Sequence, residues 1–506
     1  MLEFKCIKSK IIENKEYSLK SQMGNFKFSE PQYFYPTIEK FYKISSKTFN
    51  KNLKLSLGEL PFKIIDESNI QVNNQTISVF YKHISLLDPF QFIIGKFKVD
   101  GIENSDKEIN TVHKLTNPQS SVYVDVFVSQ VLGYYARSDM CPNFPIFYGS
   151  LLGKSDCYKF EITDEYEDLN EYKNFKNRVG FEVKGEPEIE SEIELEEVFI
   201  KDLSDNVDIS EETVWDFNSC HSIFSESDVE SEGSEKSAES ESDEESNAKT
   251  EESEESEESE EYNEEPIYAI MKNIPSGVII QEKLEGTLYE LLESNNSYNQ
   301  TEWASWFFQL CFALAFAQKN IGFFHNDLHT NNVMWSRTDK EYLFYKINEQ
   351  IFKIPTFGKI LKIIDYGRSI VTVQVKGIKK PVTLMSDQLE EDNEAGGQYN
   401  WGEYRNESYQ EIPPNPSFDM VYFVYNVIDF HSEEDSVSEF MDRILLDSEG
   451  KHIHIREDGY ERYHGFDIYK AIARKCNNGV PIELLKEKLF DEFKVNEIEV
   501  EKVYEL

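Results

Sequence analysis

The sequence predicts an α+β protein in which a sheet-bearing lobe is followed by a mainly helical lobe. Runs rich in β-branched and aromatic residues lie mostly before residue 285, whereas segments with the periodicity of amphipathic helices lie mostly after residue 286. No internal repeat is visible, and 39% of the 506 residues are hydrophobic. The chain therefore has enough apolar material for more than one sizeable core.

Strand-like runs occur at three places in the first part of the chain. Residues 77–84, ISVFYKHI, have the β-branched and aromatic content of a strand. Residues 267–274 and 277–284 form a second pair of such runs, and Pro275-Ser276-Gly277 between them predicts a turn. We expect these three runs to contribute to the sheet.

The longest helix is expected to begin at Asn299, whose spacing to Glu302 resembles a capping box, and to end at Gly322. Between these limits, apolar residues recur at helical spacing along one face: Trp303, Trp306, Phe307, Leu310, Cys311 and Leu314. Further helices are predicted from Pro416, with Asn415 as N-cap, through residue 429, over 468–475 and over 481–493.

Charge and cysteine spacing limit the classes of function. The chain has 95 acidic and 52 basic residues, and its formal net charge of -43 repels nucleic acids and anionic membranes. Its 6 cysteines form no CxxC pair, so neither a zinc knuckle nor a disulfide scaffold is expected. The start lacks the apolar core of a signal peptide, and the most apolar stretch, 306–317, is too short to span a bilayer. We expect a soluble, intracellular protein without nucleic-acid or membrane partners.

An acidic insertion divides the chain. Residues 225–265 contain 20 acidic residues and 11 serines, so they have too little apolar surface to offset the entropy of ordering and are predicted to be disordered. The acidic bias begins earlier, which places the whole insertion at 161–265. Residues 1–55 are expected to form a solvated, lysine-rich extension. The N-terminal lobe is then assigned to 56–283, interrupted by the insertion, and the C-terminal lobe to 284–506.

Two short motifs after the long helix contain candidate catalytic and metal-binding residues. GFFHNDLHTNNVMW follows the helix directly, and KIIDYGRS places Asp365 33 residues past Asn332. Phosphoryl transfer needs a carboxylate that orients the attacking hydroxyl and accepts its proton, and oxygen ligands that hold magnesium on the nucleotide phosphates. HxDxxxxN followed by DxG supplies Asp327 for the hydroxyl, and Asn332 and Asp365 for the metal. Gly367 is expected to give Asp365 its freedom of movement, and His325 to be structural.

These segments resemble the catalytic loop and the DFG element of the protein kinase superfamily, in the same order along the chain. The resemblance implies a two-lobed protein-kinase-like fold, with a β-rich N-lobe and a mainly helical C-lobe, and ATP and Mg2+ as cofactors. HNDLHTNN, IPTFGK before KIIDYGRS, and PPNPSFDM together resemble the divergent kinase-like proteins of giant DNA viruses such as mimiviruses. That likeness implies a place in the host cytoplasm or in the virus particle.

The resemblance extends to the first lobe. VFYK at 79–82 is similar to the strand motif that carries the nucleotide-binding lysine, which implies that Lys82 contacts the phosphates. Lys96 or Lys98 in FIIGKFKV is the alternative. The acidic partner of this lysine is expected in the following helix, at Asp125.

Two further segments fit the same family. GVIIQEKLEGTLYELLE resembles the hinge between the lobes, where main-chain groups face adenine, and its candidate residues are Gln281, Glu282, Lys283 and Leu284. Asp419 in PSFDM resembles the aspartate that braces the catalytic loop through its backbone. The alternative for Asp419 is an ordinary aspartate favoured by the dipole of its helix.

The sequence departs from ordinary kinases at four places. No GxGxxG precedes the candidate lysine, because Gly58 is the only glycine between residues 25 and 94. Phe80 stands where the lysine motif has a small alanine, and Asn326 replaces the arginine of HRD, which removes the cation that pairs with a phosphorylated activation loop. His329 replaces the usual lysine, so that HxDLHxxN is similar to small-molecule kinases of the aminoglycoside and choline kinase type.

Several functions therefore stay open. An active serine/threonine protein kinase, with Asp327 orienting the acceptor hydroxyl, is the leading hypothesis. The missing glycine loop and Phe80 favour a pseudokinase scaffold instead, and His329 favours a small-molecule kinase. A further hypothesis assigns the main role to the acidic insertion, as a polyanion that engages basic protein partners.

Overall fold

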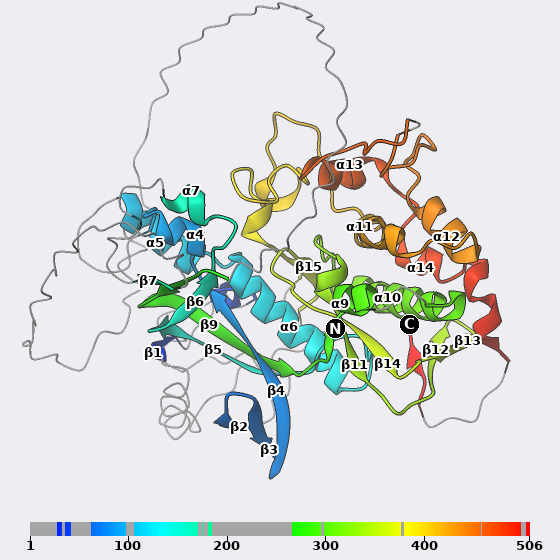
Figure 1. Ribbon diagram of the computed structural model, residues 1–506, viewed down its shortest axis with the longest axis horizontal. Helices are drawn as coiled ribbons and strands as arrows, with labels where there is room; N and C mark the ends of the chain where they lie inside the picture. Colours follow the sequence, from blue (N-terminus) through cyan, green and yellow to red (C-terminus); the bar gives the residue numbers. More distant parts are fainter. Residues whose placement is uncertain are drawn as a thin grey trace, which may run out of the picture. The chain divides into compact units, whose positions relative to one another are not determined.

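The computed structural model describes residues 28–32, 36–41, 62–97, 106–170, 175, 181–184, 266–294, 298–375, 379–456, 458–496 and 502–506. These residues belong to one compact unit, Met1–Gly185 with Pro266–Leu506. The unit contains both helices and sheets (Figure 1), which confirms the predicted α+β class. The second unit, Glu186–Glu265, lies outside the described residues, and the stretch predicted to be disordered lies outside them as well.

The largest sheet has six strands in the order β1-β5-β9-β4-β3-β2, and all neighbours are antiparallel. β9, Ile274–Glu282, is buried along nearly its whole length between β5 and β4. Val278 and Ile280 fill one apolar cluster and Ile279 another, as the alternation of side chains along a strand requires. The other strands are β1 (Phe28–Gln32), β2 (Phe62–Asp66), β3 (Asn69–Val72), β4 (Gln75–Ser85) and β5 (Phe147–Ser155).

The predicted turn at Pro275-Ser276-Gly277 is wrong, because these residues lie inside β9. The chain turns earlier, at Asn273, whose φ of 57° suits a tight turn between β8 (Tyr268–Met271) and β9. Pro275 is the second residue of the strand, where a missing donor costs little pairing. A Cβ at Gly277 would lie 2.5 Å from Leu152 Cδ2, so this glycine permits close packing of β5 on β9.

Ordered structure extends into the range assigned to the acidic insertion. β6 (Tyr158–Glu161), β8 and β7 (Phe181–Lys184) form a three-stranded sheet, and α7 covers Tyr166–Asn170. The apolar residues of this part are buried in one cluster, which includes Ile162, Tyr166, Leu169, Phe175 and Ile267. Composition placed the start of the insertion too early, because these few buried residues are diluted among acidic neighbours.

Part of the N-terminal extension belongs to the fold as well. β1 pairs with β5, and α2 (Ile38–Phe41) places Phe41, 1% exposed, against Phe127 with ring centroids 4.7 Å apart. These residues are not a solvated extension, contrary to the expectation from the lysine count. Residues 1–27, 33–35 and 42–55 of the extension lie outside the described residues.

Helix α6 (Ser121–Arg137) packs against the large sheet (Figure 1), where Val126 contacts Phe147 and Ile279. Gly133 allows the close approach, because a Cβ there would lie 2.5 Å from Phe147 Cβ. The helices that precede α6 are α4 (Pro89–Ile93) and α5 (Asp106–Thr116).

The predicted long helix is α10 (Gln300–Ile321), with the expected capping box at Asn299 and Gly322 in the left-handed conformation at its end. Two later helices differ from the prediction. α11 begins at Phe418, after a turn in which the Ser417 N–H donates to Asn415 Oδ1 and the Phe418 N–H donates to the Asn415 carbonyl oxygen. The helix predicted over 481–493 divides into α14 and a 3-10 helix. The remaining helices are α9 (Leu288–Ser294), α11 (Phe418–Val427), α12 (Ser436–Ile444), α13 (Asp467–Lys475), α14 (Pro481–Leu484) and η6 (Lys488–Phe493).

Strands also continue beyond residue 286, which corrects the expected division into strands first and helices later. Between the two motifs, residues 342–355 form the β12–β13 hairpin, which packs Leu343 and Tyr345 into the core around α10. The later strands are β10 (Gly286–Thr287), β11 (Val333–Arg337), β12 (Tyr342–Ile347), β13 (Gln350–Pro355), β14 (Lys359–Ile363), β15 (Ile370–Val373), β16 (Val382–Met385), β17 (Lys494–Val495) and β18 (Tyr504–Glu505).

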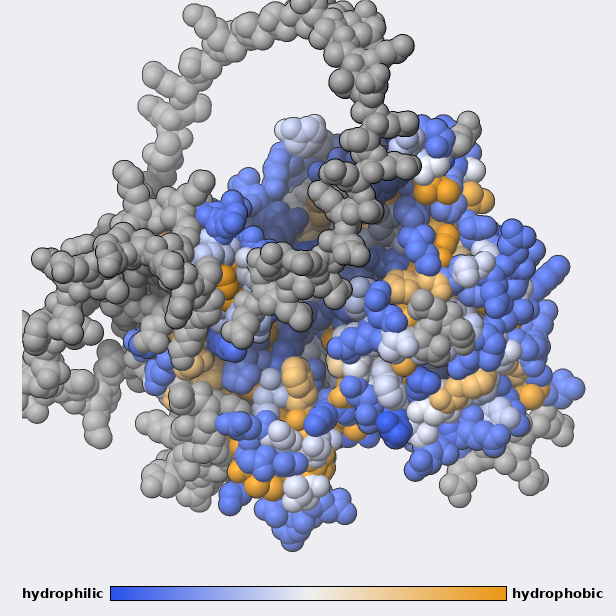
Figure 2. Space-filling model, in the orientation of Figure 1, coloured by the Kyte–Doolittle hydropathy of each residue, from blue (hydrophilic) through white to orange (hydrophobic). Residues whose placement is uncertain are grey.

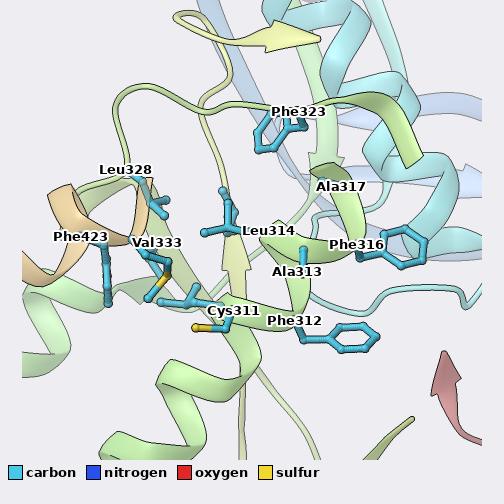
Figure 3. Packing of buried hydrophobic residues seen from close by; sticks show 14 of the residues in the cluster. Cys311, Phe312, Ala313, Leu314, Phe316, Ala317, Phe323, Leu328, Val333 and Phe423 are labelled. Carbon is cyan, nitrogen blue, oxygen red and sulfur yellow. The ribbon is translucent and has the colours of Figure 1, made fainter. Parts of the chain in front are cut away.

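The largest apolar cluster is built around α10, and it anchors the HxDxxxxN loop (residues 325–332). Figure 3 shows Leu328 and Val333, inside and just after the loop, beside Leu314 of α10 and Phe423 of α11. All four side chains are buried. Burying two apolar side chains of the loop region, at roughly 1.5–3 kcal/mol each, fixes the polar residues between them.

Hydrophilic residues cover most of the coloured surface in Figure 2, and hydrophobic residues occur there only in small groups. Large hydrophobic side chains that are exposed include Ile65, Phe80, Tyr409 and Tyr460. Among the described residues, no helix combines the length and the apolar character that crossing a membrane requires.

Candidate active site

Main-chain pairing brings the two motifs together. β11, which follows the HxDxxxxN loop, pairs with β14, which leads into the DYG segment (residues 365–367). The Ile364 N–H donates to the Asn332 carbonyl oxygen at 3.0 Å. Phe324 and Ile370 exchange two main-chain hydrogen bonds of 2.9 Å. Two segments that are separate in sequence therefore form one polar site.

A buried aspartate of α11 holds the backbone of the HxDxxxxN loop. Asp419, 1% exposed, accepts hydrogen bonds from the N–H groups of His325 (3.0 Å) and Asn326 (2.8 Å). Burial raises the pKa of Asp419, and its interactions with His325 and these N–H groups oppose the rise only in part. His325 in turn contacts the Ile364 carbonyl through Nε2 (2.8 Å) and the Asp327 N–H through Nδ1 (3.2 Å). Both side chains therefore contact main-chain groups of this part of the site. The bracing role expected for Asp419 and the structural role expected for His325 stay predictions.

Two residues of the site have left-handed backbone conformations, Asn326 with φ 66° and Asp365 with φ 61°. Asparagine tolerates this region well, and here its amide bonds the Tyr399 hydroxyl (2.9 Å) and the Arg368 carbonyl (3.0 Å). Strained backbone at Asp365 is typical of functional positions. At Gly367, by contrast, a Cβ would make ordinary contact at 3.6 Å, so the backbone does not require glycine there.

Lys82 forms ion pairs with two carboxylates. Its Nζ lies 2.7 Å from Asp125 Oδ2 and 2.9 Å from Asp365 Oδ1. Desolvation would lower the pKa of Lys82, but both carboxylates outweigh it and raise that pKa above its usual range. Burial would raise the pKa of Asp365, but attraction to Lys82 prevails and lowers it. The alternative Lys96 is exposed and follows α4 rather than standing on a strand, and Lys98 lies outside the described residues.

Asp125 connects α6 to the DYG segment as well as to Lys82. Its Oδ1 accepts from the Tyr366 N–H (3.2 Å) and from Ser129 Oγ (3.2 Å), and the residue is 3% exposed. A buried carboxylate with several donors is strongly fixed in place. The position of Lys82 therefore depends on how α6 is held.

Asn332 and Asp365 are the oxygen donors available for a cation. The Asn332 Nδ2 donates to the Asp327 carbonyl (2.9 Å) and lies 3.0 Å from His329 Nε2, which commits the amide nitrogen and leaves the amide oxygen. Magnesium takes one or two protein oxygens and completes its shell with water and phosphate oxygens, so these donors fit it. The described residues contain no cluster of three or more His, Cys, Asp or Glu side chains suited to hold a metal alone.

Asp327 accepts two hydrogen bonds on one carboxylate oxygen. Arg368 Nη1 lies 3.0 Å and the Tyr469 hydroxyl 2.8 Å from Oδ1. Burial and the charge of Asp327 raise the pKa of Tyr469, so its hydroxyl stays protonated and donates. The sequence analysis identified neither partner. The sequence could have indicated Arg368, because it is a cation directly after DYG. It gives no indication of Tyr469, which is 142 residues from Asp327.

The four predicted hinge residues divide into two pairs. Gln281 is paired with strands on both sides, and the Glu282 N–H donates to the Ile146 carbonyl at 2.8 Å. Lys283 and Leu284 follow β9, and within the described residues their main-chain groups form no hydrogen bond. Within the described residues, main-chain groups without a hydrogen-bond partner are therefore found at Lys283 and Leu284.

A further carboxylate ties α6 to the chain after the DYG segment. Asp387 has 0% exposure, its Oδ1 accepts the Ser121 N–H in the first turn of α6 (2.9 Å), and its Oδ2 pairs with Lys114 Nζ (2.5 Å). This contact caps the helix that carries Asp125. No local pattern could have indicated it, since Asp387 and Ser121 are 266 residues apart.

The turn between β2 and β3 precedes the Lys82 strand, where the resemblance places a glycine-rich loop. Asp66 Oδ1 accepts from the Ser68 N–H (2.9 Å) and from Asn69 Nδ2 (2.9 Å). These two donors are therefore hydrogen-bonded within the turn. Asp66 and Glu67 make the turn acidic. Phe80, on the following strand β4, is 52% exposed. This turn is poorly suited to bind phosphate, since it offers negative charge where a glycine-rich loop offers N–H groups.

Comparisons with known proteins find partial similarity to kinases. Over 74 residues the chain is 39% identical to "Putative serine/threonine-protein kinase" of Acanthamoeba polyphaga mimivirus, which covers 14% of this chain and 19% of that protein. Over 91 residues it is 37% identical to "Probable serine/threonine-protein kinase" of Dictyostelium discoideum, which covers 17% of this chain and 8% of that protein. No known protein-family model matches the chain. The similarity is kinase-like and does not assign a specific family, so the giant-virus relationship stays a prediction.

Proposed function

We propose that this chain is an ATP- and magnesium-dependent phosphotransferase that phosphorylates serine or threonine hydroxyls of proteins. The observation that carries the proposal is the convergence of Lys82, Asp327, Asn332 and Asp365 from separate stretches of the chain into one polar site. In this proposal the six-stranded sheet with α6 forms the nucleotide-binding lobe, and the helices from α9 onward form the other lobe.

The nucleotide would be held at three points. Lys82, fixed by Asp125 at 2.7 Å, supplies the positive charge for the α- and β-phosphates. The open main-chain groups of Lys283 and Leu284 face adenine. Asn332 and Asp365 supply oxygen ligands for magnesium, which when bound neutralises charge on the phosphates. Asp365 would hold the metal through the carboxylate that pairs with Lys82 in the free protein.

Asp327 then directs the acceptor hydroxyl. The hydroxyl oxygen forms a bond to the γ-phosphorus while the bond from that phosphorus to the β,γ-bridging oxygen breaks, and ADP leaves. The hydroxyl proton passes to Asp327, whose side chain is 22% exposed. The similarity to two proteins named as serine/threonine kinases supports this acceptor class.

Magnesium-dependent transfer from labelled ATP tests the proposal. The full chain is incubated with a mixed panel of acidic and basic proteins, and transfer by wild type is compared with transfer by Asp327→Asn. We expect the substitution to reduce transfer at least ~100-fold, as loss of a general base does. Asp442→Asn, at an exposed position of α12, is the matched control and should transfer like wild type. Equal transfer by wild type and Asp327→Asn would contradict the proposal.

One observation favours a second function, a nucleotide-independent scaffold. The acidic turn at Asp66 and Glu67 offers no free N–H at Ser68, so the phosphates would lack the cover that ordinary kinases provide. Calorimetric titration with ATP and magnesium separates the two functions. Absence of binding to wild type would favour the scaffold, whereas metal-dependent binding would favour the phosphotransferase.

A further inference from the structure

Two cations expected near the acceptor end of the site are missing from the sequence. Asn326 stands where HRD has arginine, and His329 stands where a lysine is usual. His329 uses its ring nitrogens within its own loop, where Nδ1 accepts from the Asn331 N–H (3.3 Å) and Nε2 lies 3.0 Å from Asn332 Nδ2. Lys82 is engaged by Asp125 and Asp365. A transferring phosphoryl group beside Asp327 therefore needs another source of positive charge.

Arg368 supplies a cation at this place. Its Nη1 lies 3.0 Å from Asp327 Oδ1, its Nε donates to Gln388 Oε1 (3.1 Å), and its Nη2 lies 3.3 Å from Glu394 Oε2. The side chain is 15% exposed, and the guanidinium lies 5.6 Å from the ring centroid of Tyr469. These contacts fix the guanidinium plane from three sides. They use three of its five N–H groups, and two stay available for a ligand.

Resting on the proposed function, we infer that Arg368 is a catalytic residue that contacts the γ-phosphoryl group of ATP and stabilises the charge on it during transfer. Asp327 must touch the acceptor hydroxyl, and the acceptor oxygen must touch the γ-phosphorus. A guanidinium hydrogen-bonded to Asp327 is therefore adjacent to the transferring group. Its planar donors match phosphoryl oxygens, and a partly desolvated charge acts strongly there.

The same residue joins the acceptor site to the metal site along the chain. Arg368 follows Asp365 by three positions, so the carboxylate for magnesium and the cation for the phosphoryl group lie on one short segment. Its carbonyl accepts from Asn326 Nδ2 at 3.0 Å, which ties it to the residue that replaces the usual arginine. The segment after DYG thus supplies the charge that the HxDxxxxN loop lacks.

The test compares Arg368→Met and Arg368→Lys with Arg474→Met. Arg474 is a matched control because it donates to main-chain carbonyls of residues 397, 398 and 470, and none of its hydrogen bonds within the described part of the chain involves Asp327. For magnesium-dependent transfer from ATP, we expect kcat of Arg368→Met to fall about 10²–10³-fold while KM for ATP changes little. Arg368→Lys should retain part of the rate, because lysine keeps the positive charge but lacks the planar set of N–H donors of a guanidinium.

Binding provides a readout that does not need turnover. If Arg368 contacts the γ-phosphate, Arg368→Met should reduce the preference for a non-hydrolysable ATP analogue over ADP about tenfold, as loss of a charged hydrogen bond predicts. ADP affinity and unfolding in denaturant should stay close to wild type. A merely structural role of Arg368 would not change this ratio.

The outcomes separate the two proposals. Transfer by wild type that is unchanged in Arg368→Met, or lowered equally in Arg474→Met, overturns the role of Arg368 and leaves the phosphotransferase intact. Absence of transfer by wild type, with a nucleotide preference that Arg368→Met removes, supports the phosphate contact and contradicts the transfer activity. Absence of nucleotide binding by wild type overturns both.

Discussion

Two regions of the proposed nucleotide site differ sharply in how much of the surrounding structure holds them in place. The HxDxxxxN loop and the DYG segment are held by buried apolar side chains, by main-chain pairing and by Asp419. Residues 66–69 form the short, acidic turn of the β2–β3 hairpin, and Asp66 and Ser68 hydrogen-bond to each other within this turn. The difference teaches that the residues proposed for the metal and the acceptor are held in fixed positions, whereas the turn proposed to lie over the phosphates has little support. In the proposed function, nucleotide binding depends on Lys82 and the metal.

Asp365→Ala should have the largest effect of the changes in the supported region. It removes a proposed metal ligand and a partner of Lys82, so we expect transfer to fall at least ~1,000-fold and magnesium to lose its effect on nucleotide binding. A magnesium titration of transfer and of ATP affinity checks this. Asp339→Ala, exposed between β11 and β12, is the control. A variant with normal magnesium dependence would remove Asp365 from the metal site.

Asp419→Ala should destabilise the HxDxxxxN loop. It leaves the buried N–H groups of His325 and Asn326 without their acceptor, which costs about 2–4 kcal/mol. Unfolding in denaturant measures the loss, with Asp442→Ala as the exposed control. Because burial raises the pKa of Asp419, the loss should be no larger at pH 8 than at pH 6. A loss that matches the control would show that the loop does not depend on this brace.

Lys82→Met should change how stability depends on acid. Attraction to Lys82 lowers the pKa of Asp365, so the charged carboxylate contributes stability above its unfolded pKa, and this contribution is lost as pH falls through the folded pKa. Without Lys82, burial moves the pKa of Asp365 up toward or above its unfolded value, so the acid-dependent contribution of this carboxylate shrinks and the variant should lose less stability than wild type as pH falls. Thermal unfolding of the free protein between pH 3 and pH 7 would check it. Superimposable profiles for the variant and wild type would contradict the coupling.

Glu67→Gly should have the smallest effect, because the turn proposed to lie over the phosphates is the region with little support. Removing one exposed negative charge from the turn is worth about 0.2–1 kcal/mol, so ATP affinity should rise by less than about fivefold, and less at high salt. Glu349→Gly, in the turn of the β12–β13 hairpin, is the matched control. A hundredfold rise in ATP affinity would mean that the turn at residues 66–69 controls nucleotide binding. It would contradict the smaller role that the comparison gives this turn.

The sequence by itself determined the α+β class, the limits of α10 and the candidate residues of the two motifs. These features are local, since capping, periodicity and spacing within about ten residues specify them. The same local reasoning wrongly placed a turn at Pro275-Ser276-Gly277. The glycine is required there for the close packing of Leu152 on β9, and the chain does not reverse at this point. It also missed the later strands, whose pairing depends on partners elsewhere in the chain.

Tertiary structure alone decided which charges meet. Asp387 caps α6 across 266 residues, Tyr469 reaches Asp327 across 142, and Phe41 of the lysine-rich extension is buried on α6. Such contacts join segments by the packing of their elements, and no periodicity or motif records the partner of a buried charge. The sequence gives the chemical type of each side chain. Its partner is determined only by the folded core, because packing sets the distance between two charges, and this distance sets the strength of their interaction.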